Sequence, residues 1–428
     1  MKINKIVYYG QGNGRDHINH MCSINNSENI EVYSIIQNEN ALMEQEKNVI
    51  RAKNIEEALK ETKRINPDLV VISNRADLSS GATESFKNAG FATFGITKDV
   101  ALLETSKEYS KEFMIRNNIP TPKYFVANNI DDAIDYVTKN WNKTANGLVF
   151  KVDQFSKNSF ERTAVPEDLD DAINNIHRLF SSTPNARLII EEKIKGYEIS
   201  LHVLIKGNNY FVFPFVQDYK RKYPENEGPM TAGTASVAST QQYPLELLAK
   251  IEKNIIIPTI QGFEKEKIKY DYILYIGLMI TENDVPYVLE YNTRTGNPEW
   301  LAILGLLKGS LPNLLENYYN NFQNISNLWK ENQVSIAMYG FSAGYPETTR
   351  KNFEENIVGL DKVSNDIKVI GEHIEKRNNI YYPSGGRVFA LLNTGEKFET
   401  VKNHIIDNFY KINMNGLYFR YDLKKIFD

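Results

Sequence analysis

The chain has 428 residues, of which 42% are hydrophobic and 24% are charged, a composition typical of a globular protein with roughly two to four domains. Its formal net charge of −4 argues against non-specific binding to nucleic acid or to a membrane surface, and no segment approaches the roughly 18 consecutive apolar residues of a membrane helix. The single cysteine, Cys22, excludes an intramolecular disulfide and a cysteine metal cluster. Residues 1–10 are too short and too polar for a signal peptide. We therefore expect a cytoplasmic protein.

Strands that alternate with helices are predicted over the first hundred residues. Apolar runs at residues 6–9, 69–73 and 91–95 predict buried strands, and residues 55–65 predict a helix, which together indicate a doubly wound α/β domain. A glycine loop at residues 10–14 lies between the first strand and a predicted helix. In a strand–loop–helix arrangement of this kind, backbone N–H groups can bind an anion. Its spacing is not that of a dinucleotide fingerprint, and a tight strand-to-helix turn is an equally good interpretation.

The middle of the chain begins with a helix predicted from residue 103 to about 118, which Pro120 and Pro122 end at a domain junction. Residues 148–153 predict a strand with Lys151 inside it, and buried lysines are rare unless they are paired. Strands are also predicted at 188–194, 198–204 and 210–216, the last two joined by a turn at 207–209. The polar residues 217–236 are long for a plain connection and form a candidate binding loop.

Beyond this loop, residues 245–262 predict a helix that Pro258 kinks or shortens. Residues 273–280 predict a strand that pairs with residues 287–289, and helical segments follow from 300 to about 324. From residue 334 we expect a β-rich region, with strands at 334–339, 367–370 and 384–392 and a closing stretch at 416–422.

Two polar residues stand two positions apart at the end of the strand that begins at residue 287. A period of two places the Glu290 carboxylate and the Asn292 amide on one face of the strand. Oxygen groups of this kind suit Mg²⁺, which also takes phosphate oxygens, and the neighbouring Arg294 suits a substrate anion. The pattern is weak by itself, and a strand that ends in a solvated polar turn explains it as well.

The order of motifs resembles that of the glycinamide ribonucleotide synthetase (phosphoribosylamine–glycine ligase) family of ATP-grasp ligases over essentially the whole chain. The stretches that carry the resemblance are Gly12-Asn13-Gly14-Arg15-Asp16-His17, Glu104-Thr105-Ser106-Lys107, Glu290-Tyr291-Asn292-Thr293-Arg294, Gly296-Asn297-Pro298-Glu299 and residues 94–98, 111–114, 119–121, 191–192, 196–200, 217–221, 228–229, 274–279, 385–388 and 417–422. The resemblance implies an α/β protein with an ATP-grasp fold, an N-terminal doubly wound (pre-ATP-grasp) domain and a C-terminal β-rich domain. The implied parts are an N-terminal domain at 1–100, a linker helix at 101–121, a small lid subdomain at 122–195, a central subdomain at 196–330 and a C-terminal domain at 331–428.

The family also implies roles for individual residues. ATP phosphates would contact Lys107 and Lys151, the adenine would contact Glu191, Glu192 and the backbone to Ile194, and the ribose would contact Glu198. Mg²⁺ (or Mn²⁺) would lie on Glu290 and Asn292, and catalysis would fall to Arg294 and Lys151. The implied substrate-binding residues are Gly12, Gly14, His17, Arg75, Asp218, Lys220, Arg294 and Gly296.

The implied reaction uses ATP to convert a carboxylate into an acyl phosphate, which an amine then attacks to form an amide. The partners are therefore a small-molecule carboxylate and a small-molecule amine, and we expect a monomer or a homodimer.

The sequence departs from the family pattern in the lid and in the amine-binding motifs. Residues 154–160 have lost the glycines of the family's Gly-x-x-x-Gly-Lys-Gly lid, so we expect a lid that is stiffer or shaped for another purpose. The Pro-Glu-x-Pro-Leu motif for the ribose of phosphoribosylamine is replaced by residues 74–78, where a cation, Arg75, stands in place of the carboxylate. We therefore hypothesise a divergent paralogue that joins glycine or another small amino acid to an amine other than phosphoribosylamine. The alternatives are an authentic phosphoribosylamine–glycine ligase of purine biosynthesis and a catalytically degenerate nucleotide-binding scaffold.

Overall fold

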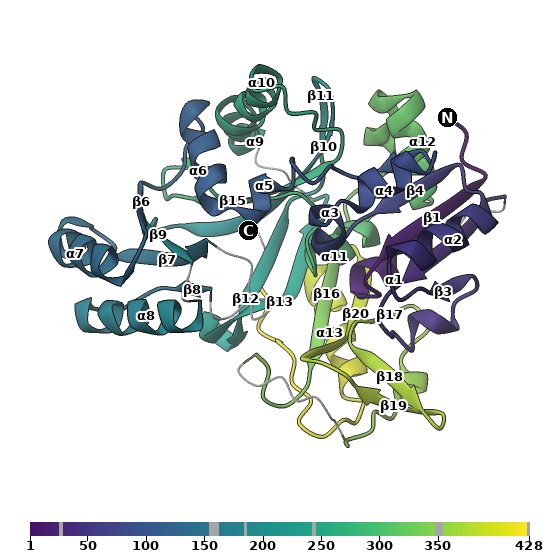
Figure 1. The fold of residues 1–428 in the computed structure, drawn as a ribbon. Helices are drawn as coiled ribbons and strands as arrows, with labels where there is room; N and C mark the ends of the chain where they lie inside the picture. The colour runs from purple at the N-terminus through teal and green to yellow at the C-terminus, as the bar shows by residue number, and fades with distance from the viewer. Residues whose placement is uncertain (25–28, 154–161, 184–185, 242–244, 347–353, 426–428) are drawn as a thin grey trace.

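The computed structural model describes residues 1–24, 29–153, 162–183, 186–241, 245–346 and 354–425. Within these residues the strands form four sheets, around which the helices pack (Figure 1). None of the described helices combines the length and the apolar character needed to cross a lipid bilayer.

A five-stranded parallel sheet is built from the N-terminal residues. Its order is β3 (Val49–Arg51), β2 (Glu31–Ile36), β1 (Lys5–Gly10), β4 (Leu69–Ile72) and β5 (Thr93–Phe94). The helices of this region are α1 (Gly14–Ile24), α2 (Ile55–Ile65), α3 (Arg75–Ser79) and α4 (Ala82–Asn88). Helix α2 has the predicted bounds because the Asn54 side chain caps its first turn and Asn66, in the left-handed conformation, ends it. The strand order reverses between β1 and β4, and the crevice at such a switch point is where open α/β sheets bind ligands.

A smaller antiparallel sheet has the order β6 (Tyr124–Ala127), β9 (Arg187–Glu192), β7 (Leu148–Asp153) and β8 (Thr163–Ala164). Helices α7 (Ile130–Asn140) and α8 (Leu169–Ser182) pack together on it (Figure 1). The helix predicted from residue 103 consists of two helices, α5 (Leu102–Thr105) and α6 (Lys107–Arg116). They separate at Ser106, which leaves the helical conformation and caps α6 by accepting a hydrogen bond from the Tyr109 amide.

The largest sheet has nine strands and continues from the central region into the C-terminal region. Its order is β15 (Pro286–Asn292), β14 (Ile273–Ile280), β10 (Tyr197–Lys206), β12 (Val216–Tyr223), β13 (Glu227–Ser239), β16 (Val334–Phe341), β20 (Arg387–Gly395) and β17 (Lys368–Gly371), and β11 (Asn209–Val212) pairs with β10. The pairing of β13 with β16 joins the central and C-terminal regions in one continuous sheet, although a domain boundary was expected between them at residue 331.

The prediction of a binding loop at residues 217–236 is wrong, because these residues form the antiparallel pair β12 and β13. Their polar character misled the prediction. Tyr219, Ala235 and Val237 face the core between the sheet and the C-terminal helix, and polar side chains occupy most of the other positions.

The helix predicted over residues 245–262 is α9 (Leu245–Ile251) followed by a π-helical segment (Glu252–Ile256) and α10 (Ile257–Lys265). Pro258 lies in the first turn of α10, where its missing N–H is tolerated, so the helix changes pitch and does not end. Helices α11 (Glu299–Gly305) and α12 (Leu311–Asn320) follow, and short 3₁₀ helices lie at Met43–Gln45, Trp141–Lys143, Pro224–Asn226, Phe322–Leu328 and Leu360–Lys362.

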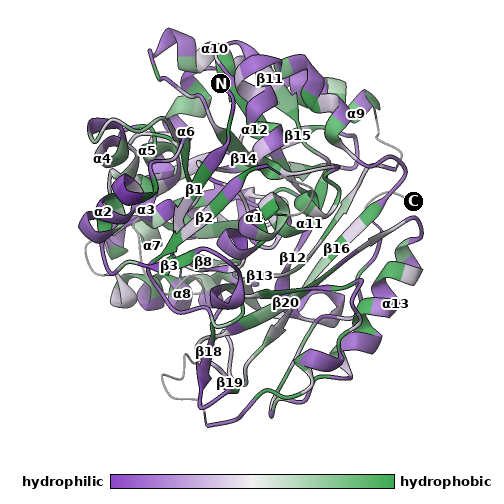
Figure 2. Ribbon diagram, turned by 90° about the vertical axis from the view of Figure 1, so that its right-hand side faces the viewer, coloured by the Kyte–Doolittle hydropathy of each residue, from purple (hydrophilic) through white to green (hydrophobic). Residues whose placement is uncertain are grey.

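The C-terminal region also contains a hairpin and a helix that were not predicted. The hairpin is β18 (Ile374–Arg377) and β19 (Ile380–Pro383), and the helix is α13 (Phe398–Phe409). Helix α13 is hydrophobic on the side that packs on β16 and β20 and hydrophilic elsewhere (Figure 2). In the closing stretch at 416–422 the structure has one isolated bridge, between Tyr418 and Phe341.

Candidate active site

The polar end of β15 is arranged as its alternation predicted. The Asn292 amide donates a hydrogen bond to Glu290 Oε1 at 3.1 Å, so both side chains lie on one face of the strand. Glu290 pairs with Gly277 of β14, and a Cβ at Gly277 would lie 3.2 Å from the Glu290 side chain. The glycine therefore leaves room for the carboxylate.

Three lysines from different elements surround Glu290. Burial alone raises the pKa of this carboxyl, but the ammonium groups of Lys220, Lys151 and Lys107, with the Asn292 hydrogen bond, lower it to about 2. Lys151 reaches across from β7 and donates to the Leu289 carbonyl at 3.2 Å, and Lys107, at the start of α6, donates to the Val152 carbonyl at 3.0 Å. Glu290 is consequently ionised at neutral pH in an electropositive surrounding.

Arg294 is held by a carboxylate that was not predicted to belong to the site, Glu104. Its Nε lies 3.2 Å from Glu104 Oε1, and its Nη2 donates to Asn292 Oδ1 at 3.0 Å. Arg75, at the start of α3, lies 3.8 Å from the same Glu104 oxygen, and the Thr293 amide donates to the other oxygen at 2.9 Å. Glu104 therefore holds Arg294 and Arg75, the two arginines predicted to bind substrate, in position. Its membership of the Glu104–Lys107 motif was the sequence feature that could have indicated this role.

The residues predicted to meet the nucleotide base and ribose lie in different surroundings. Glu191 is buried and its carboxylate is an ion-pair partner of Lys151 at 3.0 Å and of Lys111 at 3.2 Å. Glu192 faces the exposed Lys123 at 3.9 Å, and Glu198 faces Lys220 at 3.0 Å. Ile194 lies half-buried beyond the end of β9. Contacts of these residues with a nucleotide stay predictions.

Two carboxylates beside the turn at residues 296–299 have no hydrogen-bond donor among the residues that the structure describes. They are Asp218 on β12 and Glu299, which begins α11 and is 4% exposed. Burial and the charge of Glu299 raise the pKa of Asp218 well above its usual value. Gly296 is required beside them, because a Cβ at this position would lie 2.5 Å from Glu299 Oε2. Glu299 was missed as a site residue although it belongs to the Gly296–Glu299 motif.

The interpretation of the glycine loop as an anion cradle needs correction, because carboxylates of the protein itself occupy its amides. The Gly12 amide donates to Asp16 Oδ2 at 2.9 Å, and the Gly14 amide donates to Glu372 Oε2 at 2.5 Å. His17 is buried: its Nδ1 accepts a hydrogen bond from the Gly371 amide at 2.9 Å, and burial lowers its pKa to about 3. Its contact with a substrate stays a prediction. The loop is thus the tight strand-to-helix turn of the alternative interpretation.

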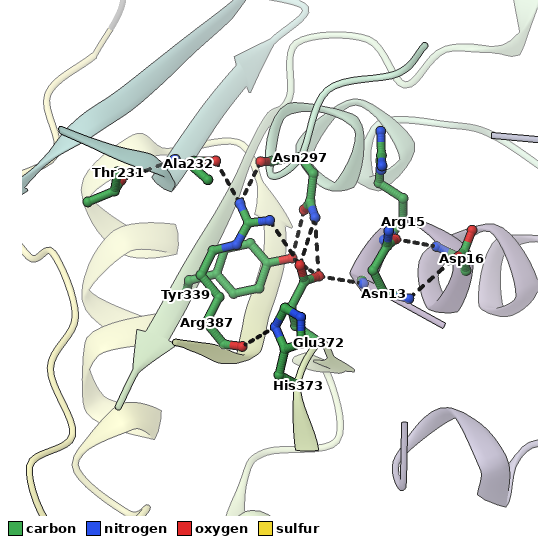
Figure 3. A network of polar contacts seen from close by, with 12 residues as sticks. Asn13, Arg15, Asp16, Thr231, Ala232, Asn297, Tyr339, Glu372, His373 and Arg387 are labelled. Carbon is green, nitrogen blue, oxygen red and sulfur yellow. Dashed lines mark hydrogen bonds and ion pairs between the residues drawn. The ribbon is translucent and has the colours of Figure 1, made fainter. Parts of the chain in front are cut away.

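Glu372 is the centre of a buried polar network that joins the C-terminal region to the site (Figure 3). Its carboxylate accepts hydrogen bonds from the Asn297 amide group at 3.1 Å, the Tyr339 hydroxyl at 2.9 Å and Arg387 at 2.9 Å. Arg387 in turn donates to the Asn297 carbonyl at 2.8 Å. The network therefore fixes both the side chain and the backbone carbonyl of Asn297, which lies between Arg294 and Glu299 in the sequence. Sequence motifs do not reveal the network, because its members are far apart along the chain.

A second polar group lies at the switch point between β1 and β4. Gln11 and Gln37 each donate to Asp77 Oδ1 at 2.8 Å, and Asp77 follows Arg75 by two residues on α3. Burial, with the nearby charge of Asp16, raises the pKa of Asp77 to about 7. The predicted lid at 154–160 lies outside the described residues.

Comparison with known proteins places this geometry in a family. The model of the phosphoribosylglycinamide synthetase N domain matches residues 4–104, and the model of the ATP-grasp (A) domain of the same enzyme matches residues 105–300. A phosphoribosylamine–glycine ligase from Caldanaerobacter subterraneus is 30% identical over 360 residues, covering 83% of this chain and 84% of the relative. The chain belongs to the phosphoribosylglycinamide synthetase family. It is therefore an ATP-grasp carbon–nitrogen ligase, as the motif order predicted.

Other known proteins match this chain over nearly its full length. A phosphoribosylamine–glycine ligase from Clostridium acetobutylicum is 28% identical over 425 residues, covering 98% of this chain and 99% of the relative. The crystal structure of the Thermotoga maritima phosphoribosylamine–glycine ligase superposes with a TM-score of 0.77 at 23% identity, covering 98% of this chain and 100% of that one. An L-amino acid ligase from Bacillus licheniformis has a TM-score of 0.66 at 14% identity, covering 97% and 99%. These likenesses confirm the predicted ATP-grasp fold.

Proposed function

We propose that this protein uses ATP to activate a small amino acid as an acyl phosphate and transfers the acyl group to an amine, releasing ADP and phosphate. The observation that carries the proposal is the Glu290 centre, in which one ionised carboxylate is surrounded by Lys107, Lys151 and Lys220. Phosphoryl transfer depends on positioning and on neutralising charge at the moving phosphoryl group, and this set of side chains supplies both.

The oxygen groups at the end of β15 fit a divalent cation. Glu290 offers a carboxylate that is ionised at neutral pH. Asn292 donates to Glu290 through its amide nitrogen, and its Oδ1, which accepts a hydrogen bond from Arg294 in this structure, would be the second ligand once it exchanged that partner for the cation. Mg²⁺ prefers one or two such protein ligands and completes its coordination with phosphate oxygens and water, and Mn²⁺ accepts the same donors. When bound, the ion would neutralise charge on the phosphate oxygens. Lys107 and Lys151 would hold the phosphates, and Arg294 would orient the carboxylate that is activated.

The donor substrate is proposed to be an α-amino acid because opposite charges flank its place. Arg294 suits the carboxylate, and the Asp218–Glu299 pair, which lacks donors among the described residues, suits an ammonium group. A cation beside these two carboxylates offsets their mutual repulsion and so favours the ionised form of Asp218. Glycine or another small amino acid is proposed because the relatives are named phosphoribosylamine–glycine ligases.

The acceptor is proposed to be an amine other than phosphoribosylamine. The support is the replacement of a sugar-binding carboxylate by Arg75 and the placement of Arg75 on α3, two residues before Asp77 at the β1–β4 switch point. A cation here suits an acceptor that has a carboxylate or phosphate of its own. The alternative is phosphoribosylamine itself, which the names of the full-length relatives favour.

The test is an ADP-release assay of the full chain with Mg-ATP, a panel of small amino acids and a panel of amines. ADP release that requires both an amino acid and an amine is the expected result, and phosphoribosylamine should be a poor acceptor. Efficient turnover of glycine with phosphoribosylamine would overturn the choice of acceptor. Absence of ADP release and of nucleotide binding under all conditions would overturn the ligase proposal.

A further inference from the structure

A buried ion triad joins Lys151 to Glu191 and to Lys111, a residue for which the sequence predicted no role in the site. Lys111 of α6 has a side chain that is 2% exposed, and its Nζ lies 3.2 Å from Glu191 Oε1 and 2.6 Å from Thr121 Oγ1. The other oxygen of Glu191 lies 3.0 Å from Lys151 Nζ. Glu191 is itself 2% exposed, so water screens neither contact well.

The charge of the triad differs from that of a simple pair. A buried Lys151–Glu191 pair alone would be neutral, and Glu191 would hold the ammonium of Lys151 against the attraction of a phosphate. With Lys111 as a second cation on the same carboxylate, the triad has a net charge of +1. Of the two lysines, Lys151 donates the hydrogen bond to the Leu289 carbonyl, next to Glu290, so the excess positive charge is presented to the cleft at Lys151.

Lys111 occupies this position although a buried ammonium is costly. Burial and the charge of Lys151 together lower its pKa to about 8 in spite of the neighbouring Glu191. An apolar side chain of similar length would fill the same space without this cost. A second lysine in contact with the pair is therefore better explained by its charge than by its packing.

We propose that Lys111 is a positioning residue for nucleotide binding, which shares Glu191 so that Lys151 keeps a net positive charge toward the phosphate groups. The inference rests on the proposed function, because it assumes that the cleft binds a nucleotide.

The experiment is calorimetric titration of the full chain with Mg-ADP for wild type, Lys111→Met, Glu191→Gln and the double variant. The Kd of Lys111→Met should rise at least about tenfold, because Glu191 then neutralises Lys151. In the double variant this neutralising carboxylate is gone, so the Kd should return to within about threefold of wild type. Lys123→Met removes an exposed lysine, 86% exposed and 3.9 Å from Glu192, and should leave the Kd within about twofold of wild type.

Different outcomes separate the two proposals. A double variant that binds as weakly as Lys111→Met would show that Lys111 acts only through structure or that Glu191 contacts the base directly, and either result overturns the inference. A Lys111→Met protein with the affinity of wild type overturns it too. A wild-type protein that binds no nucleotide would instead overturn the proposed function.

A pH titration of the wild type tests the inference without any variant. The titratable and charged groups that face Lys111 are Glu191 on β9, Lys151 on β7, Glu290 on β15 and Tyr124 on β6. Lys111 loses its proton as the pH rises through about 8, so the affinity for Mg-ADP should fall about tenfold between about pH 7 and pH 9.5. The double variant should show a flatter profile, and an equally steep profile there would contradict the role of Lys111.

Discussion

Replacement of Glu372 by alanine tests how strongly the C-terminal region holds the active-site turn. The carboxylate accepts hydrogen bonds from Gly14, Asn297, Tyr339 and Arg387, which come from four separate segments (Figure 3). The Arg387 side chain is 11% exposed, so the substitution leaves a buried guanidinium without its counter-charge. Removal of one partner of a buried ion pair typically costs about 3–5 kcal/mol.

The pKa of Glu372 gives a second measure of the same interaction. Burial alone raises this pKa, but Arg387, His373 and the hydrogen bonds from Gly14 and Asn297 lower it from 4.5 to about 2. This lowering is equivalent to about 3 kcal/mol, since one pH unit corresponds to about 1.4 kcal/mol. A carboxyl with a lowered pKa stabilises the fold fully above its unfolded-state value, and the stabilisation is lost as the pH falls from about 4.5 toward 2.

Urea unfolding followed by circular dichroism measures the effect. Glu372→Ala should lower the free energy of unfolding by about 3–5 kcal/mol at pH 7, and the difference from wild type should shrink as the pH falls from 4.5 toward 2. Glu331→Ala is the control, because Glu331 is 87% exposed and pairs with Lys308 at 3.3 Å on the surface, and its effect should stay within about 0.5 kcal/mol. A loss of less than 1 kcal/mol for Glu372→Ala, or a difference independent of pH, would refute the reasoning (~1 kcal/mol is the net value of an ordinary hydrogen bond).

Three further substitutions test the site. Glu290→Gln should lower ADP release at least about 100-fold with an unchanged circular dichroism spectrum, because the cation loses its ionised ligand, and retention of a tenth of wild-type activity would exclude this role. Asp218→Asn should raise the KM for the amino acid about tenfold or more and leave the KM for ATP unchanged; the reverse pattern in steady-state kinetics would place Asp218 with the nucleotide. Gly233→Ala should lower stability by about 2–3 kcal/mol in thermal unfolding, since Gly233 has φ +100° and its Cβ would lie 2.5 Å from Pro298 Cδ. Gly207→Ala is the control: Gly207 has φ +55° and no atom of the described residues within 4 Å of its would-be Cβ, so the substitution should lower stability by only about 1 kcal/mol.

The elements that the sequence predicted well depend on local interactions. Helix α2 is bounded by Asn54 and Asn66, which act within one turn, and the shared face of Glu290 and Asn292 follows from the period of a strand. The prediction failed at residues 217–236, because the half-exposed strands β12 and β13 are polar at many positions and gain their stability from neighbouring strands.

The sites that the sequence did not reveal depend on long-range contacts. Glu372 accepts a hydrogen bond from the Gly14 amide, 358 positions away, and Lys111 of helix α6 lies against Glu191 of strand β9. A motif can show that such a residue is present, but it cannot show which distant group the side chain contacts.

The sequence by itself determined that the chain is an α/β protein of the ATP-grasp type, because its motifs stand in a specific order. It also predicted that Glu290, Asn292, Arg294, Lys107 and Lys151 belong to its chemistry. Only the tertiary structure decided that the glycine loop is a turn filled by the protein's own carboxylates. It likewise decided that Glu299 lies near both Asp218 and Arg294 and that Glu191 is shared by two lysines. The physical reason is that electrostatic partners are chosen by distance in space, which the packing of separate elements sets and which spacing along the chain does not encode.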